Sequence, residues 1–145
     1  MALSFVSTTA EAQSVDALSN AKAAYGRGDY AAMRTDLEKR ASEGNAKAST
    51  MLGLMYGSGM GGKVDLQAAL KWYRVAANAG NREAQYNLGY LLAEEPSVGG
   101  DDKSAFDWYK RSAEQGFALA EFNLAQMYRK GRGTPVNPAE AIKWF

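Results

Sequence analysis

A repeat with a period of 36 residues runs through most of the chain and restricts the folds that it can adopt. Three glycines mark this period, because Gly44, Gly80 and Gly116 lie 36 residues apart. Other positions recur with the same spacing: Ala48, Ala84 and Ala120; Leu52, Leu88 and Leu124; Asp65, Asp101 and Asn137; Trp72, Trp108 and Trp144. Units of this length stack on one another, because a single unit cannot bury its own apolar face.

Each unit divides into two helices that are joined by a linker. The first half carries small and apolar residues at the i, i+4, i+8 spacing of a helix, as in Ala84, Leu88 and Leu92. Glycine or proline then interrupts the helical pattern, at residues 57–62, 96–100 and 131–135. The chain is therefore predicted to be all-α, a solenoid built from helix pairs.

Helix ends are also predicted by residue type. The recurring Asp or Asn side chain can accept hydrogen bonds from the free amides of the first turn of the second helix. In the third unit Asn137, Pro138 and Glu140 have the order of an N-cap, a first-turn proline and a capping-box glutamate. Gly80 and Gly116 fit the position after a helix, where a left-handed backbone is least costly.

The recurring small and aromatic residues predict how the helices pack. Gly53, Gly89 and the alanines of the repeat leave room for two helices to approach closely. Each tryptophan is followed by an aromatic residue: Tyr73, Tyr109 and Phe145. These aromatic pairs are expected to form core that fills the space between successive hairpins.

The repeat divides the chain into five segments. Residues 1–15 form a tail or the remnant of a signal peptide, and 16–44 form a divergent hairpin with a tight turn at 26–29 and no tryptophan. Three repeat units follow, at 45–80, 81–116 and, incompletely, 117–145. The last unit leaves Trp144 and Phe145 poorly covered, which predicts a solenoid that continues or weak self-association through this end.

The N-terminal segment favours export. Ala10-Glu11-Ala12 is the small-residue pattern that signal peptidase cuts, here before Gln13, and an apolar stretch precedes it. The expected location is the periplasm or the exterior, with the cytoplasm as the alternative. No apolar stretch approaches the roughly 20 residues of a membrane span.

The amino-acid composition argues against several kinds of functional site. The chain has no cysteine and no histidine, so it offers no thiolate or imidazole for a metal, a cofactor or a nucleophilic site. Its 17 basic and 16 acidic residues are spread along the chain and show none of the basic stripes of nucleic-acid binders. No metal, cofactor, catalytic residue or nucleic acid is predicted.

Several segments resemble a known repeat family. Residues 84–89 (AQYNLG), followed by residues 102–113 (DKSAFDWYKRSA), resemble the signature of the Sel1-like repeats, which are related to tetratricopeptide repeats. Residues 52–59 with residues 68–77 carry the same pattern, and residues 21–44 are similar to a plain tetratricopeptide unit. The resemblance covers residues 45–145. It implies a right-handed α-α superhelix and an adaptor role, often in bacterial envelopes or host-facing proteins.

Three motifs have a competing functional interpretation. Residues 57–63 spell a phosphate-loop pattern, but a helix precedes them and Val64 follows, so an inter-helix linker is favoured. Glu94, Glu95, Asp101 and Asp102 lack the ligand order of a calcium loop and are interpreted as a solvated loop and a helix cap. The tryptophans could stack on carbohydrate, but their recurrence at one position favours core.

A partner-binding face is predicted from the first helix of each unit. In solenoids of helix pairs these helices line the concave face, and positions between the core residues point there. The candidate residues are Lys47, Thr50, Leu54, Glu83, Tyr86, Tyr90, Glu94, Phe122, Gln126 and Lys130. Aromatic anchors among charged residues suit a peptide groove. The predicted function is a non-enzymatic scaffold that binds a protein or peptide; a receptor for a glycan or small molecule is the alternative.

Overall fold

The computed structural model describes residues 18–145, and the predicted tail over residues 1–15 lies outside them. Residues 18–26 are helical, and no strand occurs in the described part. The helices that follow are α2 (Tyr30–Ser42), α3 (Ala46–Ser58), α4 (Leu66–Asn78), α5 (Arg82–Glu94), the 3-10 helix η1 (Pro96–Val98), α6 (Asp102–Ala113), α7 (Ala118–Lys130) and α8 (Pro138–Trp144). The predicted all-α class is confirmed.

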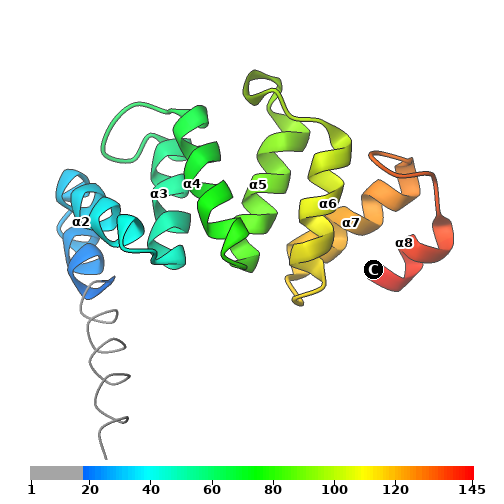
Figure 1. The fold of residues 1–145 in the computed structure, drawn as a ribbon, viewed down its shortest axis with the longest axis horizontal. Helices are drawn as coiled ribbons and strands as arrows, with labels where there is room; N and C mark the ends of the chain where they lie inside the picture. The colour runs from blue at the N-terminus through cyan, green and yellow to red at the C-terminus, as the bar shows by residue number, and fades with distance from the viewer. Residues whose placement is uncertain (1–17) are drawn as a thin grey trace, which may run out of the picture.

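The helices lie in a row that follows the order of the chain (Figure 1). Each helix from α2 to α8 packs mainly against the helix before it and the helix after it. The first helices of the three units are α3, α5 and α7, and the second helices are α4, α6 and α8. This is the arrangement of stacked helix pairs that the 36-residue period predicts.

The predicted helix caps are present. The side chains of Asp65, Asp101 and Asn137 each accept a hydrogen bond from a first-turn amide, at 2.9, 2.7 and 3.1 Å. Gly80 and Gly116 follow α4 and α6 with left-handed φ angles of 90° and 74°. One detail differs, because the Glu140 carboxylate forms an ion pair with Lys143 instead of closing the capping box.

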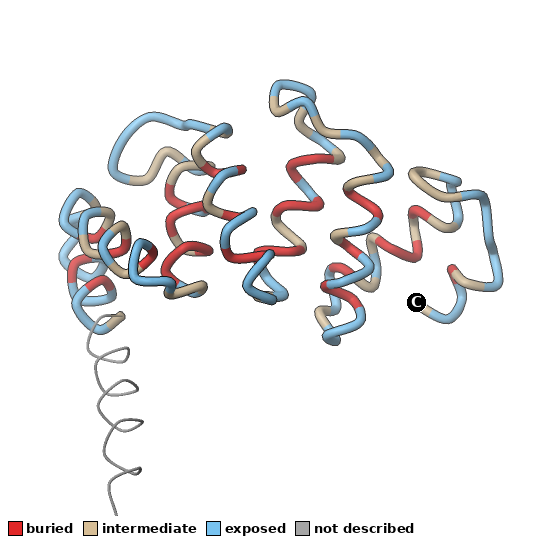
Figure 2. Tube along the Cα trace, viewed as in Figure 1, coloured by how far each residue is buried: buried red, intermediate tan, exposed pale blue. Residues whose placement is uncertain are grey.

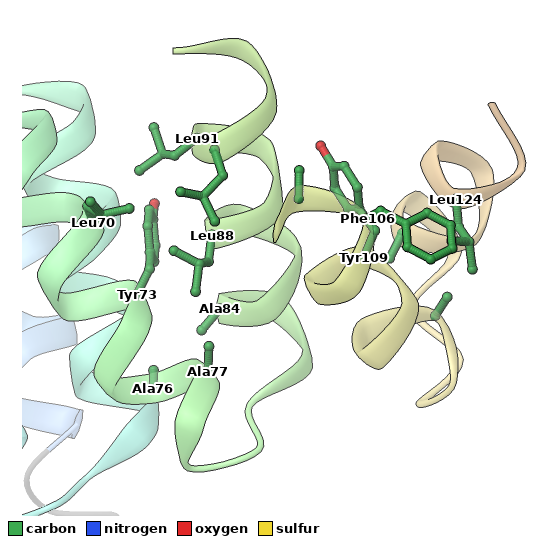
Figure 3. Packing of buried hydrophobic residues seen from close by; sticks show 14 of the residues in the cluster. Leu70, Tyr73, Ala76, Ala77, Ala84, Leu88, Leu91, Phe106, Tyr109 and Leu124 are labelled. Carbon is green, nitrogen blue, oxygen red and sulfur yellow. The ribbon is translucent and has the colours of Figure 1, made fainter. Parts of the chain in front are cut away.

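Each helix from α2 to α8 contributes buried residues to the core, as the buried segments in Figure 2 show. Ala84, Leu88 and Leu124 of the repeat have no exposed surface. Figure 3 shows Leu88 and Leu91 of α5 facing Leu70 and Tyr73 of α4. The recurring small and apolar positions therefore form a core that is shared between neighbouring units.

The aromatic pairs divide into a buried and a half-buried member. Tyr73 and Tyr109 are only 5% and 3% exposed. The tryptophans that precede them are half-buried and pack against the edge of the core, so the predicted core position is confirmed for the two tyrosines and only partly for the tryptophans. Trp72 contacts the N-terminal cluster of buried residues, whereas Tyr73 lies in the second cluster. This pair therefore spans two neighbouring hairpins.

The glycines that recur at Gly53 and Gly89 leave space for these two tyrosine rings in the core. A Cβ atom at Gly53 would lie 2.4 Å from Cε1 of Tyr73, and one at Gly89 would lie 3.0 Å from Cδ1 of Tyr109. The third unit has Ala125 at this position, and its ring, Phe145, is 63% exposed and contacts Phe122. The predicted self-association through Trp144 and Phe145 stays a prediction.

We expect Gly53→Ala to lower the free energy of unfolding by about 2 kcal/mol, because the buried Tyr73 ring has little space to move. Gly57→Ala is the matched control in the same helix, since a Cβ there would meet only ordinary contact, 3.7 Å from Ala69. Removing a helical glycine at that site should stabilise the protein by about 0.5 kcal/mol. Urea unfolding measures both changes, and equal midpoints for Gly53→Ala and the wild type would contradict the close contact.

Candidate functional site

Three clefts follow one another along the first helices of the hairpins. The methionine cleft, about 220 Å³, lies between residues 18–26 and α3, with Met33 of α2 beneath them. The middle cleft, about 260 Å³, lies between α3 and α5, with Tyr73 of α4 beneath. The aromatic cleft, about 510 Å³, lies between α5 and α7, with Tyr109 of α6 beneath. Each cleft thus has the same construction from two first helices and one second helix.

Two side chains are shared by neighbouring clefts. Leu54 lines both the methionine cleft and the middle cleft, and Tyr90 lines both the middle cleft and the aromatic cleft. Leu54 is 50% exposed and Tyr90 is 48% exposed. These residues occupy the same position in successive repeats, and Gln126 of the aromatic cleft occupies it in the third. We call the three clefts together the groove.

The structure brings six of the ten predicted binding residues into the groove. The residues of this set are Leu54, Tyr90, Glu94, Phe122, Gln126 and Lys130. Lys47 and Glu83 are exposed, but they line none of the three clefts. The helical spacing therefore selects the side of α3, α5 and α7 that lines the clefts, and the positions near the start of a helix lie outside them.

Two further residues of the predicted binding set, Thr50 and Tyr86, pack within the protein and line none of the three clefts. Thr50 is 2% exposed, and its hydroxyl donates a hydrogen bond to the Ala46 carbonyl at 2.9 Å, so its prediction as a surface residue is wrong. The half-buried Tyr86 ring lies 5.7 Å from the ring of Tyr109 and 5.3 Å from that of Phe117. Burial raises the pKa of the Tyr86 hydroxyl above its ordinary value. Tyr86 therefore supports the floor of the groove.

Arg132 connects three elements at one end of the aromatic cleft. Its guanidinium lies 2.7 Å from Oδ1 of Asp102 at the start of α6 and 3.0 Å from Oε1 of Glu94 at the end of α5. It also donates a hydrogen bond to the Ala93 carbonyl at 3.2 Å. The hydrogen bonds to Asp102 and Glu94 raise the pKa of Arg132 above its usual value. Sequence reasoning treated the loop of Arg132 as a linker and missed this contact.

The acidic cluster of residues 94–102 agrees with its predicted role as a loop and helix cap only in part. Asp101 caps α6, and its hydrogen bonds to Ser104 lower the pKa of its carboxyl. Glu94 and Asp102 are partly exposed, as expected of a solvated loop, but both carboxylates are also ion-paired with Arg132. In the described part of the chain, no three acidic, histidine or cysteine side chains gather as a metal site would require.

We expect Arg132→Ala to lower the free energy of unfolding by about 1 kcal/mol, since the pairs are partly exposed and screened by water. Arg132→Lys keeps the charge but loses the planar fork that reaches two carboxylates, so it should recover only part of the loss. The difference between the wild type and Arg132→Ala should shrink as salt rises from 0.05 to 1 M, roughly as ionic screening requires. Thermal melts at both salt concentrations measure it; a difference that does not depend on salt would contradict an electrostatic role.

Gly57 and Ser58 of the glycine-rich residues 57–63 complete α3, and the rest of the segment lies in the linker between α3 and α4. Gly59 ends α3 with a left-handed φ of 74°. Nη2 of Arg34 donates a hydrogen bond to the Met60 carbonyl at 2.9 Å, which holds the loop against α2. The loop therefore contributes Met60 to the methionine cleft by docking on the preceding hairpin.

The methionine cleft is the part of the groove that sequence reasoning missed. Its walls include Tyr25, Met33, Met51, Met55 and Met60. The divergent first hairpin does not share the 36-residue register, so counting from the repeat could not align its residues with α3. One available signal was composition, because four of the six methionines lie between residues 33 and 60.

Comparison with known proteins identifies the repeat. The pattern of the Sel1 repeat matches residues 46–81, 82–117 and 118–145. No curated protein matches the chain in sequence. In the part of the chain that is described, no helix combines the length and the hydropathy that crossing a membrane requires.

Two solved structures are similar to the chain. The crystal structure of a Sel1 repeat protein from Oxalobacter formigenes is 32% identical, covers 88% of this chain and superposes with a TM-score of 0.79. A protective antigen of uropathogenic Escherichia coli strains, which displays an SLR fold, is 38% identical over 77% of this chain, with a TM-score of 0.73. This chain covers 52% of the first structure and 24% of the second. By its repeats and by this likeness, the chain belongs to the Sel1 repeat family.

Proposed function

We propose that this Sel1 repeat scaffold binds an extended peptide segment or a helix of another protein in the groove, and that it acts by binding without catalysis. The observation that carries the proposal is the row of three neighbouring clefts, in which Leu54 and Tyr90 each line two clefts. Exposed apolar side chains gathered in one concave surface are typical of a protein-interaction site. Aromatic side chains there contribute disproportionately to binding energy.

The shape of the groove favours an elongated ligand. The three clefts are open and share walls, so a ligand that follows the groove contacts α3, α5 and α7 in turn. Successive side chains of a peptide can then enter successive clefts, as in other groove-binding modes. The binding energy is distributed over several weak contacts.

A small molecule or glycan is the second candidate, and the aromatic cleft alone supports it. Its volume of about 510 Å³ lies within the range of ligand pockets, and Asn123, Gln126 and Lys130 place polar groups beside Phe122 and Tyr109. A ligand confined to this cleft would not contact Leu54. Loss of binding on Leu54→Ala therefore separates a peptide that follows the groove from a ligand of the aromatic cleft.

A selection from a random-peptide display library tests the proposed function. Peptides that bind the immobilised wild type should not bind a Leu54→Ala/Tyr90→Ala double variant. They should be retained on Val75→Ala, whose side chain on α4 is 44% exposed and lines none of the three clefts. Enriched peptides that bind all three proteins equally would place the binding surface elsewhere. Recovery of no peptide would count against peptide binding.

We also propose that the protein works outside the cytoplasm. The motif Ala10-Glu11-Ala12 supports this location, and so does the likeness to a protein described as a protective antigen. Fractionation of the cells that produce the protein, followed by N-terminal sequencing, should find a chain that begins at Gln13 in the periplasmic or secreted fraction. A cytoplasmic chain that keeps the residues before Gln13 would contradict export.

A further inference from the structure

We infer that the partner segment in the groove carries a large apolar side chain for the methionine cleft and an acidic residue for Lys130. This inference rests on the proposed function and specifies the chemistry of the ligand. It follows from two observations at opposite ends of the groove: an apolar cleft that no side chain of residues 18–145 fills, and a lysine that forms no ion pair among those residues.

The methionine cleft fits one large apolar side chain. Met33 and Met55 form its buried base, 5% and 2% exposed, while Tyr25 and Leu54 form a rim that is about half exposed. Its volume of about 220 Å³ is below the range of drug-sized ligands, roughly 300–1,000 Å³, and suits a single side chain. Methionine walls are flexible and polarisable, so the cleft can adapt to leucine, isoleucine, methionine or phenylalanine.

The charges along the groove disfavour a basic segment at both ends. Lys130 lines the aromatic cleft and Lys22 lines the methionine cleft, and neither forms an ion pair among residues 18–145. Glu94 is the acidic residue that lines the same cleft as Lys130, and it is already paired with Arg132 at 3.0 Å. An acidic residue of the partner supplies the missing counter-charge, whereas a basic residue is repelled.

The middle cleft disfavours an acidic residue in the part of the partner that crosses it. Glu95 lines the middle cleft and has no ionic partner in the described part of the chain. A second carboxylate beside Glu95 is unfavourable. The methionine cleft takes the large apolar side chain, so the acidic residue of the partner lies at the Lys130 end, and the part of the segment that crosses between Leu54 and Tyr90 is apolar or neutral.

The same random-peptide library tests this inference with a charge reversal. Peptides selected on the wild type should be enriched in Asp or Glu at one position and in large apolar residues at another. Lys130→Glu should weaken a selected acidic peptide by about tenfold. A synthetic peptide with Lys in place of its acidic residue should bind Lys130→Glu better than it binds the wild type. Variants that merely fold poorly cannot produce this reversal of preference.

A second variant tests the apolar anchor. Met51→Gln keeps the length of a half-buried side chain of the methionine cleft but makes its wall polar. It should weaken peptides with a large apolar anchor and leave the acidic preference unchanged. Groove-binding peptides with no acidic preference, or with affinity that Met51→Gln does not alter, would overturn the inference while the proposed function stands. Failure to select any peptide that depends on Leu54 and Tyr90 would overturn both.

Discussion

Gly133→Ala should lower the free energy of unfolding by about 3 kcal/mol, a large share of the stability of a domain of this size. A Cβ atom at this position would lie 2.1 Å from the Asp102 carbonyl oxygen and 2.6 Å from its carbonyl carbon. These are backbone atoms in the first turn of α6, so they cannot swing aside as a side chain does. The loop that follows α7 must therefore move away from α6, which also separates Arg132 from Asp102.

Gly116→Ala is the matched control for this effect. Gly133 and Gly116 have similar left-handed φ angles of 67° and 74°, but a Cβ at Gly116 would meet no atom within 4 Å. The control therefore carries only the backbone strain of a left-handed alanine, about 1 kcal/mol. Urea unfolding of the two variants measures the difference, which isolates the contact with Asp102. Equal destabilisation by both would show that the loop approaches α6 less closely than described.

Tyr90→Ala should weaken a selected groove peptide by about 30-fold, or about 2 kcal/mol, because Tyr90 forms a wall of two clefts at the centre of the groove. Leu54→Ala should weaken the same peptide by about fivefold, since leucine is less often a dominant contact. Because both residues line the middle cleft and meet the same part of a bound segment, their effects should be coupled and not simply additive. Fluorescence anisotropy with a labelled peptide measures both.

Folding controls separate this loss of binding from loss of structure. Tyr90 and Leu54 are each about half exposed, so their alanine variants should unfold at nearly the same urea concentration as the wild type. Val75→Ala removes a side chain with similar exposure on α4 and should leave peptide affinity unchanged. Equal affinity for the wild type and Tyr90→Ala would contradict the groove as the binding site.

The sequence predicts the fold well because the repeat multiplies each local signal. A single Leu88 or Asp101 has little meaning by itself, but their recurrence at 36-residue intervals identifies a core position and a helix cap. Capping depends only on residues within one turn of the helix, so it can be predicted without knowing the tertiary contacts. The N-cap bonds of Asp65, Asp101 and Asn137 confirm this.

The details of the groove depend on contacts that no local pattern records. Tyr86 and Phe122 share one repeat position, yet Tyr86 packs against Phe117 and Tyr109 while Phe122 is 52% exposed. Thr50 lies at that same position in the first unit and is buried. Exposure at this position therefore depends on the neighbouring helices and loops and not on the repeat register.

Contacts between repeats could not be predicted from the sequence either. Arg132 pairs with Asp102 and Glu94, which lie 30 and 38 residues before it in the chain. The methionine cleft combines a helix of the divergent first hairpin with α3 and the loop after it. Both arise where successive hairpins meet, at separations that periodicity within a helix cannot describe.

The most direct test of the groove is a methyl NMR titration of the protein with a selected peptide. We predict chemical-shift changes at the methyl groups of Met51, Leu54 and Leu91, which line the methionine and middle clefts. The methyl groups of Val75 and Ile142, which are exposed and line none of the three clefts, should not shift. Shifts confined to Val75 or Ile142, with Leu54 unchanged, would contradict the account and place the partner on another face of the solenoid.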